Sequence, residues 1–540
     1  MKPWARNGRL RRWTFVRGAL VPAALVSLLG GCTVGPDFAQ PKPWWSPASW
    51  GQHEVKPVVA SSKPVVAAVD PAWWNQFHDA EMTALEGRLV ESNLDLRIAM
   101  IRLGESRAAY GQARAAMFPT LNANGSYTRE LISPNGIVSA FGAGAPGGSF
   151  TAQSGIASGL VGTQAGTVIP NTTGVIPPFN LYQYGFDATW EIDLWGRVRR
   201  GVEAAQASVD AANDQLRDTL VAIEAELARD YIQLRGVQRT RQIIEENLAS
   251  ARESLKLTQE RATTGLTTDL DVANAQAQAD GIAAQLPQLE QQEAQLINAV
   301  SQLLGQPPQA LAGDLRPAKP IPPVPPQIPV GLPSDLARRR PDIRAAEAQL
   351  HAATAQIGVA VASFFPSISL SGSFGFQSVT TNNIFNWNSQ QYGFGPTVVL
   401  PIFQGGQLVS TLELRKQQEK EAAVAYQRTV LAALHDVDNA LTAYDAEQKR
   451  NQRLATETAE ARRALELARA RYVQGISTFL DVLEAQRVVL AAEQQLADST
   501  TTVSTNLVAL YKSLGGGWES AYPLPDTTAK AAPVTPVKGG

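Results

Sequence analysis

The sequence predicts a mainly α-helical protein that carries four amphipathic β-strands and is built from two copies of one unit. Three observations support this fold class. Two long stretches lack proline, four short segments alternate apolar and polar residues, and two pairs of segments match each other at a fixed shift. The chain has 540 residues and 34 prolines, so stretches of this length without proline favour continuous helix.

The helices are inferred from the proline-free residues 197–286 and 402–522. A helix from Arg197 to Glu260 would extend on the order of 95 Å at about 1.5 Å per residue, far more than an average globular helix. Apolar residues recur in steps of three and four, which predicts closely packed long helices, either as a bundle or as a hollow cylinder. The recurring residues are Val202, Ala205, Val209, Ala212, Leu216 and Ile223, and later Val430, Leu434, Val437, Leu441 and Tyr444.

Four segments alternate apolar and polar residues with a period of two. The longest runs from Tyr182 to Leu194, two others follow Pro119 and Pro366, and the fourth runs from Tyr392 to Ile402. Each has about the 9 to 11 residues of a transmembrane β-strand, with apolar residues outward and polar residues inward. Half-buried strands of a soluble sandwich are the alternative interpretation.

Four strands cannot close a barrel by themselves. An open sheet edge in hydrocarbon would leave backbone groups unpaired, at a cost of several kcal/mol each. Two copies would give eight strands and an interior filled by side chains, whereas three would give twelve strands and room for a water-filled lumen. The strands therefore predict an oligomer, and three is the smaller number of copies that leaves a conducting pore.

Internal repetition sets the expected organisation. Residues 261–305 match residues 471–515 at a shift of 210 with 13 identities in 45, and Phe118-Pro119 matches Phe365-Pro366 at a shift of 247. Each copy is predicted to hold a helix, two strands, a long helix and a further helix. The expected segments are a signal peptide at 1–31, an anchored linker at 32–70, the first repeat at 71–305, a stiff Pro-rich connector at 306–332, the second repeat at 333–515 and a flexible tail at 516–540.

The N-terminus is predicted to be a lipoprotein signal. Residues 1–31 hold six basic residues and no acid, and the apolar stretch from Ala19 to Leu29 is too short to cross a bilayer. It runs into Leu29-Gly30-Gly31-Cys32, an ending typical of a bacterial lipobox, so Cys32 is the expected lipidation site. Loss of the leader takes the net charge from -2 to about -8. Thr33 stands where Asp would indicate retention at the inner membrane, which favours the outer membrane.

Six segments carry a resemblance to a known family. They are Cys32–Phe38, Trp73-Trp74 with Phe77, Phe186–Gly196, Arg339–Arg344, Leu400–Phe403 and Gly475–Val482. They resemble outer-membrane factors of the TolC type, and in particular the NodT-type outer-membrane lipoproteins of RND efflux systems. The resemblance implies a homotrimer with a twelve-stranded β-barrel in the outer membrane, a long periplasmic α-helical barrel, and an equatorial belt that holds the connector and both chain ends.

The resemblance also implies the function and the partners. The chain would be a passive, lipid-anchored conduit in the outer membrane of a Gram-negative bacterium, joined to a periplasmic adaptor and an inner-membrane pump that expel small molecules. A channel for peptide or protein secretion is one alternative. A non-conducting, lipid-anchored periplasmic scaffold, whose strands form a soluble sheet, is the other.

Two turns are the expected adaptor-contact tips by this resemblance, Thr264-Gly265-Leu266-Thr267 and Gln474-Gly475-Ile476-Ser477. Each joins a long helix to a shorter one. Glycine supplies the freedom for a tight reversal, and Thr267 or Ser477 is expected to cap the next helix. A helix hairpin without a docking role is the simpler interpretation.

The residues beyond the second turn are the expected periplasmic aperture. Leu480, Glu484 and Arg487 fall on one helix face, at spacings of four and three. In similar proteins that face lines the closed inner opening, where a leucine ring would block passage and a carboxylate ring would select cations. A solvated Glu–Arg pair is the competing interpretation. Asp481 is expected either at the same aperture or in the first helical turn, where the helix dipole favours an acid.

Composition and motifs argue against other functions. With 47 basic and 49 acidic residues, the chain lacks the basic excess of a general nucleic-acid binder. One cysteine and four histidines favour neither a disulfide framework nor a metal site, and the H-E-x-x-H, G-x-S-x-G and G-x-x-x-x-G-K motifs are absent from the sequence. Gly142, Gly144 and Gly147 lack a preceding strand and are interpreted as part of a flexible extracellular loop at 131–186. We therefore expect no enzyme, no cofactor and no metal.

Overall fold

The fold consists of a small β-sheet unit and a larger helical unit. A computed structural model describes residues 33–41, 63–65, 67, 70–131, 178–331 and 336–522. The first unit takes in residues 1–37, 110–204 and 354–416, and the second takes in residues 38–109, 205–353 and 417–540. Each unit draws on both halves of the chain, because each half leaves the helical unit, forms two strands and returns.

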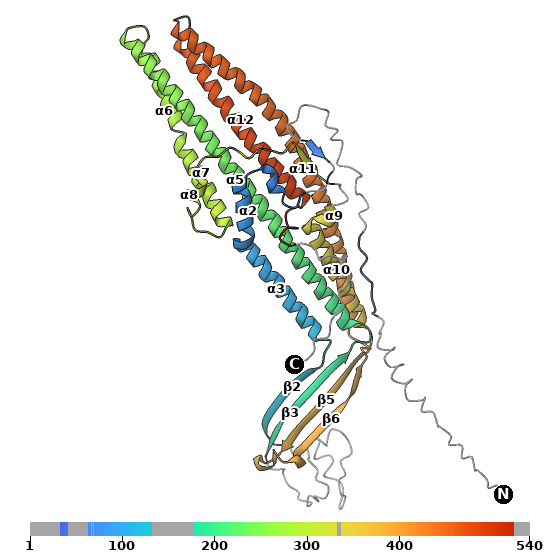
Figure 1. Ribbon diagram of the computed structural model, residues 1–540. Coiled ribbons are helices and arrows are strands. Elements are labelled where there is room, and N and C mark those ends of the chain that lie inside the picture. Colours follow the sequence, from blue (N-terminus) through green and yellow to red (C-terminus); the bar gives the residue numbers. More distant parts are fainter. Residues whose placement is uncertain are drawn as a thin grey trace, which may run out of the picture. The chain divides into compact units, whose positions relative to one another are not determined.

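The first unit contains a four-stranded antiparallel sheet in the order β2-β3-β5-β6 (Figure 1). The strands are β2 Thr120–Glu130, β3 Phe179–Ile192, β5 Ser367–Ser378 and β6 Gln390–Val399. All four predicted strands are confirmed. The loop expected at 131–186 ends earlier than predicted, because β3 begins at Phe179 rather than at Tyr182.

The register of the sheet places aromatic residues next to each other on one face. Phe186 pairs with Phe374, and Tyr184 pairs with Phe376, with ring centroids 5.2 Å apart. Gly185 pairs with Gly375, and a Cβ on Gly185 would lie only 2.7 Å from the Gly375 Cα, so these two backbones approach closely beside the stacked rings. The apolar residues that alternate with polar ones in the sequence thus lie on one face of the sheet.

Long helices dominate the rest of the structure. The helices are α2 Ala80–Ser92, α3 Leu94–Ala115, α5 Arg197–Thr263, α6 Asp269–Ala283, α7 Leu286–Leu303, α8 Ala312–Leu315, α9 Leu336–Arg339, α10 Pro341–Ala362, α11 Gln407–Val473 and α12 Phe479–Leu514. Both α5 and α11 have 67 residues, so the predicted long helices are confirmed. Within the described part of the chain, none of the helices combines the length and the apolar character needed to span a membrane.

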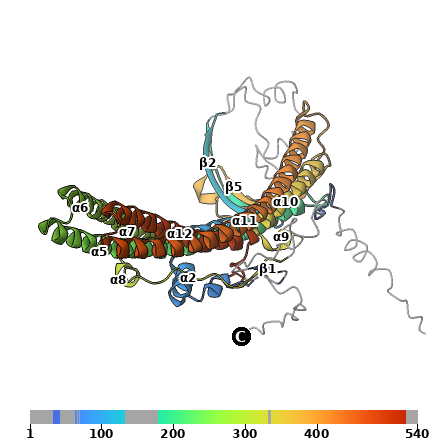
Figure 2. The same cartoon turned by 90° about the horizontal axis from the view of Figure 1, so that it is seen from above.

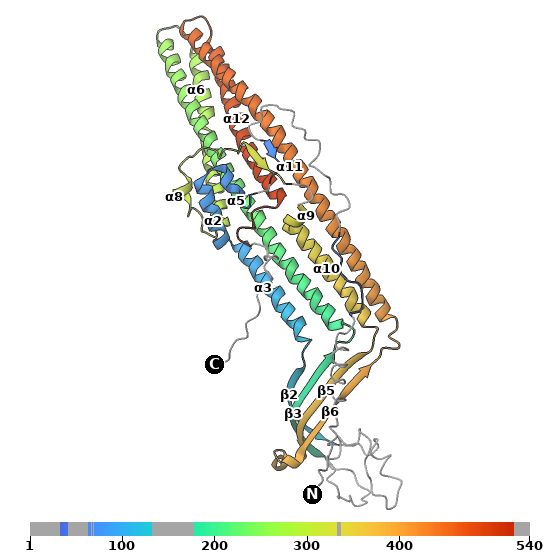
Figure 3. The same ribbon diagram turned by 45° about the vertical axis from the view of Figure 1, so that its right-hand side comes forward.

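The helical unit contains two hairpins, α5–α6 and α11–α12, that lie side by side (Figure 3). In each repeat the returning arm, α6–α7 or α12, is followed by a glycine that lies against the end of another helix. Gly305 follows α7 with φ +64°, and a Cβ there would lie 2.7 Å from the Ser92 carbonyl oxygen at the end of α2. Gly515 follows α12 with φ +68°, and a Cβ there would lie 3.0 Å from the Arg340 Cα, just before α10. The two repeats therefore build the same end-to-end helix joint.

Aromatic residues before α2 and after α12 pack into the core of the helical unit. Trp73 and Phe77 of the short helix η1, Trp73–Phe77, are buried, and the Trp73 ring stacks on Tyr511 of α12 at 5.2 Å. Trp518 is only 2% exposed, and the Arg217 guanidinium lies 4.9 Å from its ring. The flexible tail predicted from residue 516 is therefore wrong for residues 516–522, which pack against the helices because of this tryptophan.

The Pro-rich connector is not simply an extended spacer. It contains α8 and the short strand β4, Gln327–Pro329, which pairs in parallel with β1, Lys63–Val65, of the N-terminal linker. Figure 2 shows α2 and α8 on one face of the layer that contains α5, α7 and α12. We refer to α2, α8 and the connector together as the collar.

The rows of buried residues predicted along the two long helices are only partly correct. In α11, Val430, Val437, Leu441 and Tyr444 are buried as expected. In the first turns of α5 the buried line is instead Ala204, Ala207 and Ala211, whereas Val202, Ala205 and Val209 stay partly exposed. Small alanines allow a closer approach than valine, so the buried line is displaced from the predicted one.

Candidate functional site

The two hairpin turns have the backbone conformation predicted for them. Gly265 and Gly475 have φ +70° and +75°, which glycine adopts without strain. Leu266 N–H donates to the Arg261 carbonyl at 2.9 Å, and Ile476 N–H donates to the Arg471 carbonyl at 2.9 Å. These are Schellman bonds, which satisfy the last carbonyls of the long helix. The side chains that follow the glycines are left exposed, 68% for Leu266 and 63% for Ile476.

The predicted caps are wrong by one residue. Thr268 and Thr478 cap α6 and α12, in capping boxes with Asp271 and Asp481. The Schellman bonds use the residue after glycine, so one more residue is needed before the next helix begins. Thr267 donates its hydroxyl proton to Asp271 Oδ2 at 2.6 Å instead, and this hydrogen bond lowers the pKa of Asp271. The buried Ser477 Oγ has no hydrogen-bond partner within the described residues.

The predicted aperture residues share an exposed face of α12. Leu480 is 63% exposed, and Asp481, Glu484 and Arg487 are exposed as well. Asp481 Oδ2 accepts from Thr478 N–H at 3.1 Å, so the first-turn role of Asp481 is observed directly. Arg487 Nε donates to Gln278 Oε1 of α6 at 3.0 Å, which makes it a bridge between the two hairpins.

Further contacts join the hairpins near their tips, and the sequence analysis did not find them. Arg261 of α5 donates to the Tyr472 carbonyl at 2.9 Å, and its guanidinium lies 4.6 Å from the Tyr472 ring. Gln486 of α12 donates to Ser254 Oγ at 2.8 Å. Arg261 and Arg471 occupy matching positions in the two repeats, but nothing in the sequence indicates which of them contacts the other hairpin.

The expected lipidation site, Cys32, lies outside the described residues. The chain after it is fixed at the start of α5. Val34 N–H donates to the Trp195 carbonyl at 3.1 Å, and Asp37 pairs with Arg200, a side chain that is only 4% exposed. The segment next to Cys32 is therefore held beside the junction between β3 and α5.

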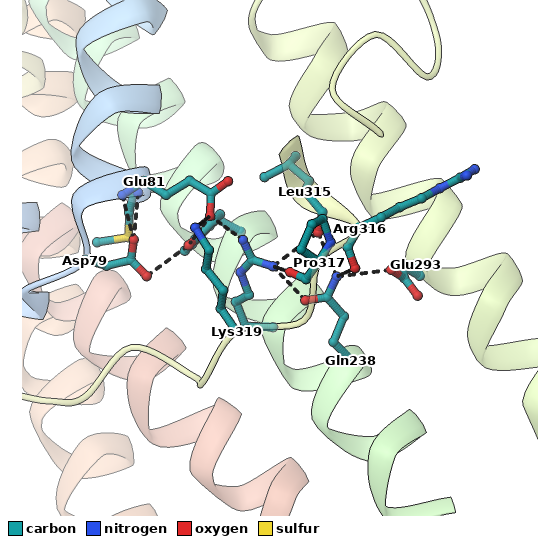
Figure 4. A network of polar contacts seen from close by, with 11 residues as sticks. Asp79, Glu81, Gln238, Glu293, Leu315, Arg316, Pro317 and Lys319 are labelled. Atoms are coloured by element: carbon teal, nitrogen blue, oxygen red, sulfur yellow. Dashed lines mark hydrogen bonds and ion pairs between the residues drawn. The ribbon is translucent and has the colours of Figure 1, made fainter. Parts of the chain in front are cut away.

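A polar network fastens the collar to the middle of α5 (Figure 4). Arg235 is completely buried, pairs with Glu81 of α2, and donates to the carbonyls of Leu315 at 3.1 Å and Pro317 at 2.9 Å. Lys319 also pairs with Glu81, at 2.7 Å.

Gln238 continues this network one turn further along α5. Its amide nitrogen donates to Glu293 Oε1 of α7 at 3.0 Å and to the Leu315 carbonyl at 2.8 Å. One helix face thus binds α2, α7 and the connector, three segments that are distant in the sequence.

Two carboxyl groups are buried in the helical unit. Glu86 of α2 and Glu224 of α5 are each 1% exposed, and neither has a hydrogen-bond partner within the described residues. Burial raises the pKa of both well above the ordinary value; the charge of Glu224 raises that of Glu86 further, and the charge of Glu519 does the same for Glu224. Gly517 has φ +122°, a conformation that L side chains rarely adopt, and a Cβ there would lie 2.1 Å from Glu224 Oε2.

The described residues contain no group of three or more His, Cys, Asp or Glu side chains arranged to hold a metal ion. The glycines at 142, 144 and 147 lie outside the described residues.

Comparison with known proteins bears on both repeats. The model of the family described as outer membrane efflux protein matches residues 86–306 and 332–516. The chain is 32% identical to the probable efflux pump outer membrane protein TtgC of Pseudomonas putida over 92% of its length and 95% of the relative's, and 31% identical to nodulation protein T of Rhizobium leguminosarum bv. viciae over 95% and 97%. The solved structure of the outer-membrane channel OprN superposes with a TM-score of 0.78 at 32% identity, over 90% of this chain and all of that one. The chain therefore belongs to the outer membrane efflux protein family, as its resemblance to NodT-type, TolC-like channels predicts.

Proposed function

We propose that this protein is the outer-membrane channel of a tripartite efflux system, a passive trimeric conduit that receives small molecules from a periplasmic adaptor and an inner-membrane pump. The observation that carries this proposal is the four-stranded sheet, in which β2 and β6 each have one neighbour. Pairing β2 of one copy with β6 of another closes the sheet, and three copies give twelve strands. The names of the relatives refer to efflux, which favours this role over secretion of peptides or proteins.

Apolar stripes on the helical unit support assembly of several copies. On α3, Leu94, Ile98 and Ile101 are 57%, 46% and 57% exposed at steps of four and three, and on α11 Val424 and Leu431 are 63% and 43% exposed. Stripes of this kind on outer helices mark surfaces that a partner covers. Because α3 leads into β2 and α11 follows β6, the same pairing of copies would bring these two helices together.

We expect the purified protein to be a trimer and to show single-channel conductance in planar bilayers. The Leu480→Ala variant should open more often than the parent, because a large exposed side chain is removed from the proposed aperture. Leu467→Ala, which removes a leucine that is 59% exposed on α11, is the matched control. A monomer in mild detergent and in membranes, or a protein without conductance in either variant, would instead favour a non-conducting scaffold.

The tips at Gly265, Leu266 and Thr267 and at Gly475, Ile476 and Ser477 are proposed to meet the adaptor. Ile476→Asp places a charge on an exposed side chain without changing the glycine turn, so we expect drug susceptibility to rise to the level of a deletion strain. Trimer formation should be unaffected. Val488→Asp, on an α12 side chain that is 45% exposed and three turns from the tip, should leave resistance intact. Unchanged resistance in Ile476→Asp would refute the docking role.

Lipid attachment at Cys32 is part of the same proposal. Its support is the segment after Cys32, which is fixed beside the point where β3 ends, the expected level of the membrane surface. A mature protein whose mass lacks diacylglycerol and an acyl chain would exclude the anchor without affecting the channel.

A further inference from the structure

The connection between β5 and β6 is a folded segment rather than an open loop. It comprises residues 379–389, at the opposite end of the sheet from the junctions with the long helices (Figure 1). It contains two 3-10 helices, η3 Thr381–Asn383 and η4 Trp387–Ser389. The Ser389 hydroxyl donates to the Asn383 carbonyl at 2.7 Å, which joins the two helices. We refer to residues 379–389 as the lip.

Aromatic residues of the lip lie on the sheet instead of beyond it. The Phe385 ring lies 5.6 Å from the Tyr184 ring of β3. The Trp387 ring lies 6.1 Å from the Phe376 ring and 6.5 Å from the Phe374 ring, both on β5. Phe374 is four residues, or about 14 Å, before the end of this strand. The lip therefore lies back along the strand, where a connection that only reversed the chain direction would not reach.

The face of the sheet beneath the lip is the apolar one. On β5 the apolar residues alternate with polar residues that point to the opposite face. That opposite face is polar on the neighbouring strands too, where the Asn124 side chain donates to the Asp187 carboxylate. In a transmembrane barrel the apolar face contacts acyl chains and the polar face lines the lumen. The proposed channel therefore places the lip on its outer wall.

The lip itself presents more apolar surface. Ile384 is buried, whereas Phe385 and Trp387 are 81% and 65% exposed. Residues 348–412 contain no Asp, Glu, Lys or Arg, so the lip carries no charge that would oppose insertion among acyl chains. Aromatic girdles mark both edges of the apolar band of membrane β-barrels. The composition of the lip thus matches a lipid surface.

The length of β5 places the lip at an edge of the hydrocarbon layer. Its 12 residues extend about 37 Å at roughly 3.4 Å per residue, which gives a height of about 26 to 31 Å at a strand tilt of about 35 to 45°. The apolar band of such barrels is about 25 Å tall. Aromatic residues that cover the last few positions of β5 therefore lie where acyl chains meet the polar headgroups.

The position of the lip argues against a second copy of the chain as its partner. The lip contacts β3 and β5, the two central strands of the sheet. The pairing of copies proposed above uses β2 and β6 instead. The surface of the lip thus stays outside the contact between copies and faces the lipid that surrounds the barrel.

We propose that the lip is a membrane-inserting segment, in which Phe385 and Trp387 insert among lipid acyl chains at the outer surface of the outer membrane. This contact fixes the depth of the barrel at the end opposite the helices. The inference rests on the proposed channel function, which places the sheet in the membrane. It adds a lipid-binding role for a connection between two strands.

Fluorescence quenching in phosphatidylcholine vesicles tests the inference. An environment-sensitive dye is attached to the full-length Phe385→Cys variant, and the parent protein, labelled in parallel, corrects for dye on Cys32. Phe385 is 81% exposed, so its replacement should not disturb the fold. We expect strong quenching by a phospholipid with a nitroxide near the top of one acyl chain, weaker quenching by one with the nitroxide at the chain end, and little quenching by iodide in the water.

Two control variants separate failure of the inference from failure of the channel. Phe394→Cys labels a residue that is 84% exposed on β6 and lies on the same face of the sheet, so lipid should quench it. Leu266→Cys labels a helical tip, 68% exposed, which iodide alone should quench. If Phe385→Cys behaves like Leu266→Cys while lipid quenches Phe394→Cys, the lip faces water or a protein and the inference is overturned. If lipid quenches neither Phe385→Cys nor Phe394→Cys, the sheet is not in the membrane, and the proposed function fails as well.

Discussion

Replacing Arg235 by methionine is expected to lower the stability of the helical unit by about 3 to 5 kcal/mol, the usual cost of removing one partner from a buried charged network. Methionine preserves much of the side-chain volume but donates no hydrogen bonds. The Pro317 carbonyl would lose this donor, and the Leu315 carbonyl would keep only the one from Gln238. The ion pair with Glu81 and the stacking of the guanidinium 4.8 Å from the Tyr231 ring would be lost too. Lys319 still pairs with Glu81, which keeps the loss from being larger.

Thermal unfolding and hydrogen exchange measure this effect. Amides of residues 312–319 should exchange faster in Arg235→Met, because α8 loses its main attachment to α5. Arg239→Met is the matched control, one turn along the same helix, where a side chain that is 39% exposed contacts Glu246 at 3.7 Å. Surface pairs of this kind contribute about 0 to 1 kcal/mol. Equal unfolding temperatures for the two variants would mean that Arg235 does not hold the collar.

Glu224→Gln is expected to make the protein more stable at alkaline pH and less sensitive to pH. A carboxyl whose pKa is raised by folding holds its proton in the folded state when the unfolded chain has already lost it. Stability is therefore highest near and below the ordinary pKa of 4.5 and falls as the pH rises toward the folded-state pKa. The fall is about 1.4 kcal/mol per pH unit for each such group.

The measurement is the unfolding temperature of the solubilised protein from pH 4.5 to pH 9. The parent should lose stability across this window. Glu224→Gln should match it at the acid end and exceed it at the alkaline end, because glutamine cannot ionise. Glu226→Gln changes a side chain that is 49% exposed on the same helix and should follow the parent. A Glu224→Gln curve parallel to that of the parent would show that Glu224 is not the titrating group.

Local patterns in the sequence predicted most of the fold. The alternation through Tyr184 and Phe186 identified β3, and the absence of proline identified both 67-residue helices. The two tip glycines were predicted because positive φ at a tight reversal is a local requirement. These features depend on neighbouring residues, which the sequence displays directly.

Features that depend on distant partners were not predicted. Arg235 looks like an ordinary polar residue of a long helix, and only the fold brings Glu81 and Pro317 to it. The same holds for the burial of Glu86 and Glu224. The caps at Thr268 and Thr478 were misplaced because the Schellman bonds lengthen each turn by one residue, a detail of geometry that composition does not reveal.

The glycine joints at Gly305 and Gly515 have a consequence for how such a chain can change in length during evolution. Residues 269–303 and 479–514 each fill the span between a tip and a joint, alongside a stretch of α5 or α11. Deleting two turns from α5 alone would shift one tip toward the sheet. Because the returning arm keeps its length, Gly305 would move away from the Ser92 carbonyl. An insertion or deletion that keeps both joints must therefore occur in all four arms, which are α5, α6–α7, α11 and α12. Both repeats then shorten or lengthen together.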